Sequence, residues 1–107
     1  MSTSGSVVVW EWLFNSAHWL PYEPDASNHI ETAHCQWLAR GGARAWPPSH
    51  SSVFLKQVSS SLAPFVVDVN TMTQTNQSTG AFLMLKRSAR HKAESLYTAA
   101  VYVSCNL

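Results

Sequence analysis

The first apolar pattern in the chain is typical of a strand pair. Residues 7–14 (VVVWEWLF) are β-branched and aromatic and contain neither Gly nor Pro, which predicts a strand with apolar side chains on both faces. A polar turn at residues 15–17 follows, and residues 18–22 form the returning strand. Because Pro21 lacks an N–H group, we place that strand at an edge of the sheet.

The next pattern predicts a helix. Pro24 suits the first helical position, and Asp25 places a negative charge at the positive end of the helix dipole. Gly41 and Gly42 then end the helix. Between these signals the apolar residues recur at helical spacing, at Ala26, Ile30, Ala33, Trp37 and Leu38.

The rest of the chain favours short strands joined by polar turns. Residues 39–51 are rich in Gly and Pro and predict a surface loop, and residues 70–80 are polar and predict a turn. Strands are predicted at 53–55, 65–69 and 81–85; for the last 20 residues a helix at 90–97 and a strand at 99–103 both stay open. The fold class is therefore α+β, with one helix on a small, strongly bent antiparallel sheet.

Length and charge narrow the class of protein. The chain has 107 residues, which favours one domain, and only 12% of them are charged, against roughly 25% in an average soluble domain. A net charge of +1 argues against a general DNA or RNA binder. No apolar run approaches the ~20 residues of a membrane span. No basic residue precedes the first apolar run, so we expect no secretory signal and a location in the cytoplasm or nucleus.

The sequence offers no convincing catalytic or metal site. No Gly-x-Ser-x-Gly motif presents a nucleophile. His29 and His34 are five residues apart and do not share a helix face, so we expect ordinary surface or half-buried histidines. Two cysteines, Cys35 and Cys105, are too few for a metal site or a disulfide framework. We therefore predict no catalytic residue, no metal and no cofactor.

Two residue groups leave alternatives open. Trp10 and Trp12 share a strand face and form either a stacking platform for a base or sugar, or part of the core. The second group is a cluster of basic residues, which form either a solvated face or an anion-binding edge: Lys86, Arg87, Arg90 and Lys92.

Three segments form an ordered set of motifs. They are Trp10-Glu11-Trp12, Trp19-Leu20-Pro21-Tyr22, and a helix opening at Pro24-Asp25 that continues through Ser27 to Ile30 and Glu31. This set resembles the WWE domain, which is named for two Trp and a Glu, and most closely the first WWE domain of Deltex-type ubiquitin ligases. The run 61–69, followed by Met72, Gln74 and Thr79-Gly80, extends the similarity. The signature residues are thus Trp10, Glu11, Trp12, Trp19, Ile30 and Asp68.

The resemblance implies a half-open antiparallel β-barrel of about six strands with one α-helix packed across it. We expect a disordered N-terminus at 1–6, the WWE domain at 7–87 and a tail outside the family pattern at 88–107. That tail docks on the barrel, stays disordered or is the end of an atypical transcript. The loop 39–51 is longer than is usual for the family. Because no RING or other catalytic domain follows, no enzymatic activity is expected.

The resemblance also implies a function. WWE domains are interaction modules in ubiquitination and ADP-ribosylation proteins, and a tandem pair in Deltex proteins binds the ankyrin repeats of Notch. We therefore expect a monomeric, non-enzymatic module that binds a protein partner, the ankyrin repeats of a Notch-type receptor, in a ubiquitination or Notch signalling context. The alternative is binding of iso-ADP-ribose, poly(ADP-ribose) or an ADP-ribose-like ligand. DNA and membranes are not expected partners.

The family's ligand contacts fall on Tyr22, Phe65, Gln74, Lys86 and Arg87. The Tyr22 ring can stack on adenine, and the Gln74 amide can donate and accept hydrogen bonds. Phe65 keeps a ring but loses the hydroxyl group of the family's tyrosine. Leu83 stands where the family has an arginine for phosphate, so the resemblance implies that ADP-ribose binding is weakened.

Overall fold

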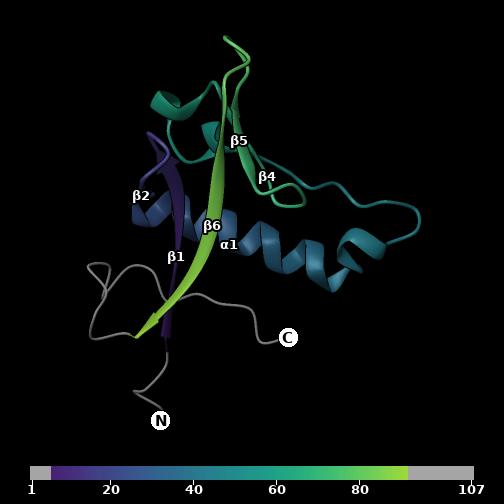
Figure 1. The fold of residues 1–107 in the computed structure, drawn as a ribbon. Coiled ribbons are helices and arrows are strands. Elements are labelled where there is room, and N and C mark those ends of the chain that lie inside the picture. The colour runs from purple at the N-terminus through teal and green to yellow at the C-terminus, as the bar shows by residue number, and fades with distance from the viewer. Residues whose placement is uncertain (1–5, 92–107) are drawn as a thin grey trace.

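The computed structural model describes residues 6–91, which form six strands, one α-helix and three short 3-10 turns (Figure 1). The strands and the helix are β1 (Ser6–Phe14), β2 (His18–Pro21), α1 (Pro24–Ala39), β3 (Ser52–Phe54), β4 (Phe65–Asp68), β5 (Thr73–Asn76) and β6 (Phe82–His91). The 3-10 turns are η1 (Gly42–Arg44), η2 (Leu55–Gln57) and η3 (Ser60–Leu62).

The predicted strand pair is present as the β1–β2 hairpin. Its turn contains Asn15 and Ser16, which both adopt positive φ, at 44° and 64°. Asn tolerates this left-handed conformation better than most residues, so the polar turn can reverse the chain tightly. The antiparallel register aligns Phe14 with His18 and Glu11 with Pro21, so β2 pairs only with the second half of β1.

Helix α1 also follows its sequence signals. Pro24 begins it, Asp25 lies in its first turn, and it ends at Ala39. Gly41 then adopts a φ of +107°, which residues with a Cβ atom rarely adopt. Gly42 is buried against the Trp37 side chain, so the glycine pair both ends the helix and lets the chain turn closely beside it.

The six strands form one antiparallel sheet in the order β2-β1-β6-β5-β4-β3. Strand β6 pairs with β5 through residues 82–84 and with β1 through residues 85–91, so it joins the two halves of the sheet. It runs along the length of the molecule (Figure 1). Strands β2 and β3 stay at the edges, so the sheet does not close. The expected half-open α+β architecture is confirmed.

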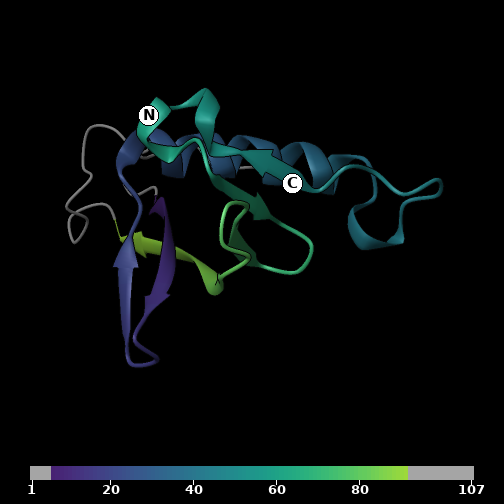
Figure 2. The ribbon, with the colours of Figure 1, turned by 90° about the horizontal axis from the view of Figure 1, so that it is seen from above.

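The helix lies along one side of the bent sheet, and the core forms between them (Figure 2). Where β1 approaches α1, the backbone of Trp10 forms two hydrogen bonds that are not part of the strand pairing. The Trp10 N–H donates to Ser27 Oγ at 3.0 Å, and the Trp10 carbonyl accepts from the Tyr22 N–H at 2.9 Å. Buried core side chains come from strands, turns and helix alike: Val8, Trp10, Tyr22, Ala26, Ile30, Trp37, Val53, Leu55, Val67, Val69 and Leu85.

Two details of the predicted strands are wrong. The polar segment 70–80 was expected to be a turn, yet it contains strand β5 (Thr73–Asn76). Its side chains are only half-buried, so no apolar alternation marks the strand in the sequence. The last strand continues to His91 instead of ending at residue 85, which places Lys86 and Arg87 inside β6. Pairing with β1 extends β6 through this polar stretch.

Predictions for the chain ends fall largely outside the described residues. Residues 1–5 and 92–107 are not described, so the expected N-terminus and the helix or strand considered near the C-terminus stay predictions, as does any role of Cys105. Arg90 and His91 belong to β6. Between residues 6 and 91, no helix has the length and apolar character needed to cross a membrane.

We predict that Ser27→Ala lowers the free energy of unfolding by about 1–3 kcal/mol, because the buried Trp10 N–H loses its acceptor. Urea unfolding followed by tryptophan fluorescence measures this change. Ser78→Ala is the matched control, since Ser78 is exposed in a turn, and it should change the stability by less than about 0.5 kcal/mol. Equal effects of the two substitutions would contradict the role given to Ser27.

Candidate ligand-binding pocket and its neighbouring charges

A pocket of about 390 Å³ opens where β2, the start of α1 and the inner face of the sheet meet. Its volume lies within the range of small-molecule sites, roughly 300–1,000 Å³. The wall is mostly apolar, and its one charged residue is the acidic Glu23. The lining residues are Trp12, Pro21, Tyr22, Glu23, Ala26, Leu62, Phe65, Gln74 and Leu83.

Tyr22 and Gln74 provide polar groups in this apolar wall. Tyr22 lies between β2 and α1, and its hydroxyl donates to Gln74 Oε1 at 2.6 Å. Burial raises the pKa of the Tyr22 hydroxyl well above its usual value, so the phenol stays protonated. Because the Gln74 oxygen accepts this bond, the Gln74 amide NH2 is the donor that this side chain can offer a ligand.

Phe65 and Leu83 provide apolar wall beside this polar pair. Gln74 on β5 is the register partner of Leu83 on β6 and of Val67 on β4, so their side chains share the inner face of the sheet. Phe65 lies two residues before Val67 and therefore points to the same face. The structure thus brings together three of the five residues proposed by resemblance, Tyr22, Phe65 and Gln74, and it places Leu83 directly beside them.

Lys86 does not line this pocket. It is the register partner of Glu11, and its Nζ lies 3.9 Å from Glu11 Oε1 and 4.8 Å from the centre of the Trp19 ring. Glu11 is itself buried and also accepts a hydrogen bond from the Ser88 hydroxyl at 2.8 Å. The ammonium group is therefore placed over an aromatic ring and near a carboxylate, away from the pocket wall.

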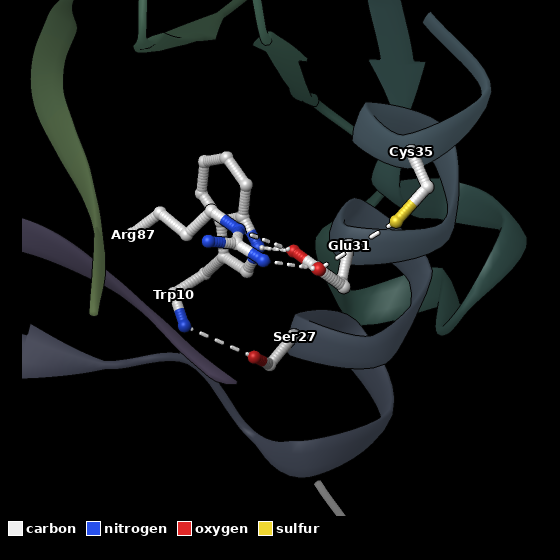
Figure 3. A network of polar contacts seen from close by, with 5 residues as sticks. All are labelled: Trp10, Ser27, Glu31, Cys35 and Arg87. Atoms are coloured by element: carbon white, nitrogen blue, oxygen red, sulfur yellow. Dashed lines mark hydrogen bonds and ion pairs between the residues drawn. The ribbon is translucent and has the colours of Figure 1, made fainter. Parts of the chain in front are cut away.

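Arg87 is held even more firmly, by Glu31 on α1 (Figure 3). Its Nε donates to Glu31 Oε1 at 2.8 Å and its Nη2 donates to Oε2 at 2.7 Å, which is the bidentate geometry of a strong charge-assisted pair. Glu31 is completely buried, whereas the Arg87 side chain is 29% exposed. The hydrogen bonds to Glu31 raise the pKa of Arg87, so the guanidinium stays charged.

The Glu31 carboxylate has further neighbours. Trp10 Nε1 donates to Oε1 at 2.9 Å, and Cys35 Sγ lies 3.6 Å from Oε2 (Figure 3). The His34 ring packs edge-on against Trp10 with 5.3 Å between ring centroids. Burial is the main cause that lowers the pKa of His34; Arg87 lowers it further and Glu31 opposes the change. The His34 ring packs against Trp10, which donates to Glu31, and its lowered pKa therefore disfavours a second positive charge beside Arg87.

The signature residues divide between packing, turn formation and the pocket. Trp10 is fully buried in the core, and Trp12 is partly buried against that core and also lines the pocket. Stacking of Trp12 on a base or sugar stays a prediction. Ile30 is also fully buried, and Trp19 is half-buried beneath Lys86. Asp68 shapes the β4–β5 turn, because its Oδ1 accepts from the backbone N–H groups of Asn70 and Thr71 at 2.8 and 3.2 Å.

Four further residues of the pocket wall are not among the ligand contacts predicted from the sequence. Leu62 lines the pocket from η3, and its one signal in the sequence is its place in the run 61–69 that extends the family resemblance. Pro21, Glu23 and Ala26 also line the pocket, because the end of β2 and the start of α1 form part of its wall. In the described part of the chain, no group of three or more His, Cys, Asp or Glu residues is arranged to hold a metal ion.

The fold agrees with what comparison with known proteins shows. The sequence profile of the WWE domain matches residues 8–87. The chain belongs to the WWE domain family. As a WWE domain it is a binding module, and the expected resemblance to Deltex-type proteins is confirmed by the relatives described next.

The similar curated proteins are ubiquitin ligases. E3 ubiquitin-protein ligase DTX4 of Mus musculus is 40% identical over 88 residues, which cover 82% of this chain and 13% of the ligase. E3 ubiquitin-protein ligase DTX1 is 38% identical in Xenopus laevis and 35% in Homo sapiens, over 77% of this chain. The matched segment spans only 11% to 13% of these ligases, so their other activities lie beyond what the match covers.

We predict that Arg87→Ala lowers the free energy of unfolding by about 3 kcal/mol, because Glu31 would stay buried without its bidentate partner. This is the lower end of the range for buried pairs, since Arg87 is partly exposed. Urea unfolding at neutral pH measures the loss. The control is Lys86→Ala. The Lys86–Glu11 pair is longer and its cation is more exposed, so this substitution should lower the free energy of unfolding by about 1 kcal/mol or less. A loss below about 1 kcal/mol for Arg87→Ala would contradict the structural role.

Proposed function

We propose that this WWE domain is a non-enzymatic module whose pocket binds an uncharged, largely apolar part of a protein partner. Trp12, Phe65 and Leu83 provide the apolar contact surface, and the Gln74 amide supplies a hydrogen bond that orients the bound group. Aromatic anchors in a preformed concave site are typical of residues that dominate the energy of protein interfaces.

The observation that carries this proposal is the absence of an available cation at the pocket. No Lys or Arg lines it within the described residues, and its charged member, Glu23, would repel an anion. The two basic residues proposed by resemblance pair instead with buried carboxylates, Lys86 with Glu11 and Arg87 with Glu31. A phosphorylated ligand would therefore enter an apolar site without a counter-charge, which is unfavourable.

For the partner we propose the ankyrin repeats of a Notch-type receptor, in a ubiquitination or signalling context in the cytoplasm or nucleus. This choice rests on the resemblance to Deltex-type WWE domains and is supported by the 35–40% identity with the ligases DTX1 and DTX4. We further propose that the module acts as a monomer and does not bind DNA.

We predict that a Notch-type ankyrin-repeat domain binds the chain and that Leu83→Glu weakens this binding about 10-fold or more. The substitution places a carboxylate in the apolar wall, where partner binding would bury it unpaired. Isothermal titration calorimetry gives both affinities, and the melting temperature verifies that the variant is folded.

Met84→Glu is the matched control. Met84 follows Leu83 on β6, so its side chain points to the opposite face of the sheet, and it is 45% exposed. The same added charge there should leave the affinity nearly unchanged. If the unaltered chain shows no detectable binding, the ankyrin partner is refuted. If Met84→Glu weakens binding more than Leu83→Glu does, the partner binds the face of the sheet opposite the pocket, and the pocket is refuted as the binding site.

A second candidate is binding of ADP-ribose, iso-ADP-ribose or poly(ADP-ribose). The observation that favours it is that Tyr22, Phe65 and Gln74 line one cavity of suitable volume. Stacking of an adenine on an aromatic ring and hydrogen bonding to the Gln74 amide would support it. The cation that would complete this site is missing, since Leu83 occupies the position of the family's arginine.

We predict that the unaltered chain binds iso-ADP-ribose weakly or not at all, and that Leu83→Arg raises the affinity about 10- to 150-fold. A charge-assisted hydrogen bond contributes about 1.5–3 kcal/mol, which sets this range. Calorimetry with iso-ADP-ribose measures it, and Met84→Arg controls for the added charge. Micromolar binding that Leu83→Arg does not change would show that the missing arginine is not the limiting feature.

A further inference from the structure

The loop after α1 presents the most exposed large apolar side chain in the described part of the protein. Trp46 is 90% exposed, compared with 69% for Phe82. Pro47 and Pro48 follow it and are also exposed. Tryptophan is enriched at the energetic centres of protein interfaces, and one that is almost fully in water is a candidate anchor for a partner.

Backbone hydrogen bonds hold the loop near both of its ends. In the η1 turn the Arg44 N–H donates to the Gly41 carbonyl at 3.1 Å, and the Ala45 N–H donates to the Gly42 carbonyl at 3.2 Å. At the other end, the Ser51 carbonyl accepts from the Val69 N–H at 3.0 Å. The rings of the two prolines limit backbone rotation between these ends. Trp46 is therefore presented from a restrained loop, which lowers the entropy lost on binding.

The charged residues next to Trp46 in sequence are positive. Arg40 and Arg44 are both exposed, and neither takes part in an ion pair within residues 6–91. The sequence contains no Asp or Glu from residue 32 to residue 67. An acidic surface would therefore meet two exposed guanidinium groups that lie close to the tryptophan in sequence, and no repelling carboxylate from this stretch.

This surface is separate from the pocket described above. The pocket is lined by Tyr22, Glu23 and Ala26 at the start of α1, whereas the loop follows the end of the same helix. A helix of 16 residues is about 24 Å long. Figures 1 and 2 show the loop extending beyond the end of α1, on the side away from the β1–β2 hairpin.

We infer that Trp46, with Pro47, Pro48, Arg40 and Arg44, forms a second docking surface that binds an acidic protein surface with an apolar pocket for the indole ring. The inference rests on the proposed function, because the partner is the same ankyrin-repeat domain. A nucleic acid fits less well, since the loop offers only two arginines and the chain has a net charge of +1.

The test is a titration of the ankyrin-repeat domain with the full chain and four variants. Trp46→Ala should weaken binding about 10-fold or more, and Phe82→Ala, the exposed aromatic control, should not. Arg44→Glu should weaken binding and flatten its dependence on salt, whereas Lys56→Glu, on η2, should change neither. Because all four residues are exposed, unchanged melting temperatures are expected.

The outcomes separate this inference from the proposed function. If the unaltered chain binds and Leu83→Glu weakens binding while Trp46→Ala does not, the second surface is refuted and the pocket stands. If the unaltered chain does not bind the ankyrin repeats, both proposals fall. A single-stranded oligouridine probe completes the test: binding to it that is lost in Trp46→Ala, with ankyrin binding unaffected, would overturn the assignment of a protein partner.

Discussion

The buried carboxylate of Glu31 is the constraint on which the arrangement of this domain depends. A completely buried charge is strongly unfavourable unless hydrogen bonds and an opposite charge compensate it. Trp10 on β1 and Arg87 on β6 are register partners in the sheet, and both donate to this one side chain on α1. The position of the helix across the sheet is therefore set by specific bonds as well as by apolar packing, which is non-directional.

This constraint also shapes what the pocket can bind. With α1 held against β1 and β6, its first turn and the preceding Tyr22 form one side of the pocket, opposite Gln74 and Leu83. The same bonds that position the helix engage Arg87, whose guanidinium is directed to Glu31 and which does not line the pocket. A cation that family resemblance assigns to ligand binding thus has a structural partner here, and Leu83 supplies no replacement. Both features favour an apolar occupant of the pocket.

The parts of the fold that could be predicted from sequence are those with local causes. The polar turn at Asn15, the proline start of α1 and the glycines at 41 and 42 act within a few residues, and the β1–β2 hairpin and the helix were correctly placed. Strand β5 was missed because its half-buried polar side chains show no apolar alternation. It is a strand because its backbone pairs with β4 on one side and β6 on the other. The Glu31–Arg87 pair joins residues 56 positions apart, so no local pattern reveals it.

The two proposed surfaces lie at opposite ends of one rigid helix, and this geometry bears on the kind of partner that suits them. Repeat proteins such as ankyrin arrays are elongated and present extended binding surfaces. Because helix α1 is about 24 Å long, one such array would contact the pocket and Trp46 at different places, without the two contacts competing for space. Once one contact forms, the second becomes intramolecular, so two modest interfaces can combine into a much tighter one. The positive charge near Trp46 would then act mainly on the rate and orientation of encounter, while the apolar pocket would determine how long the complex lasts.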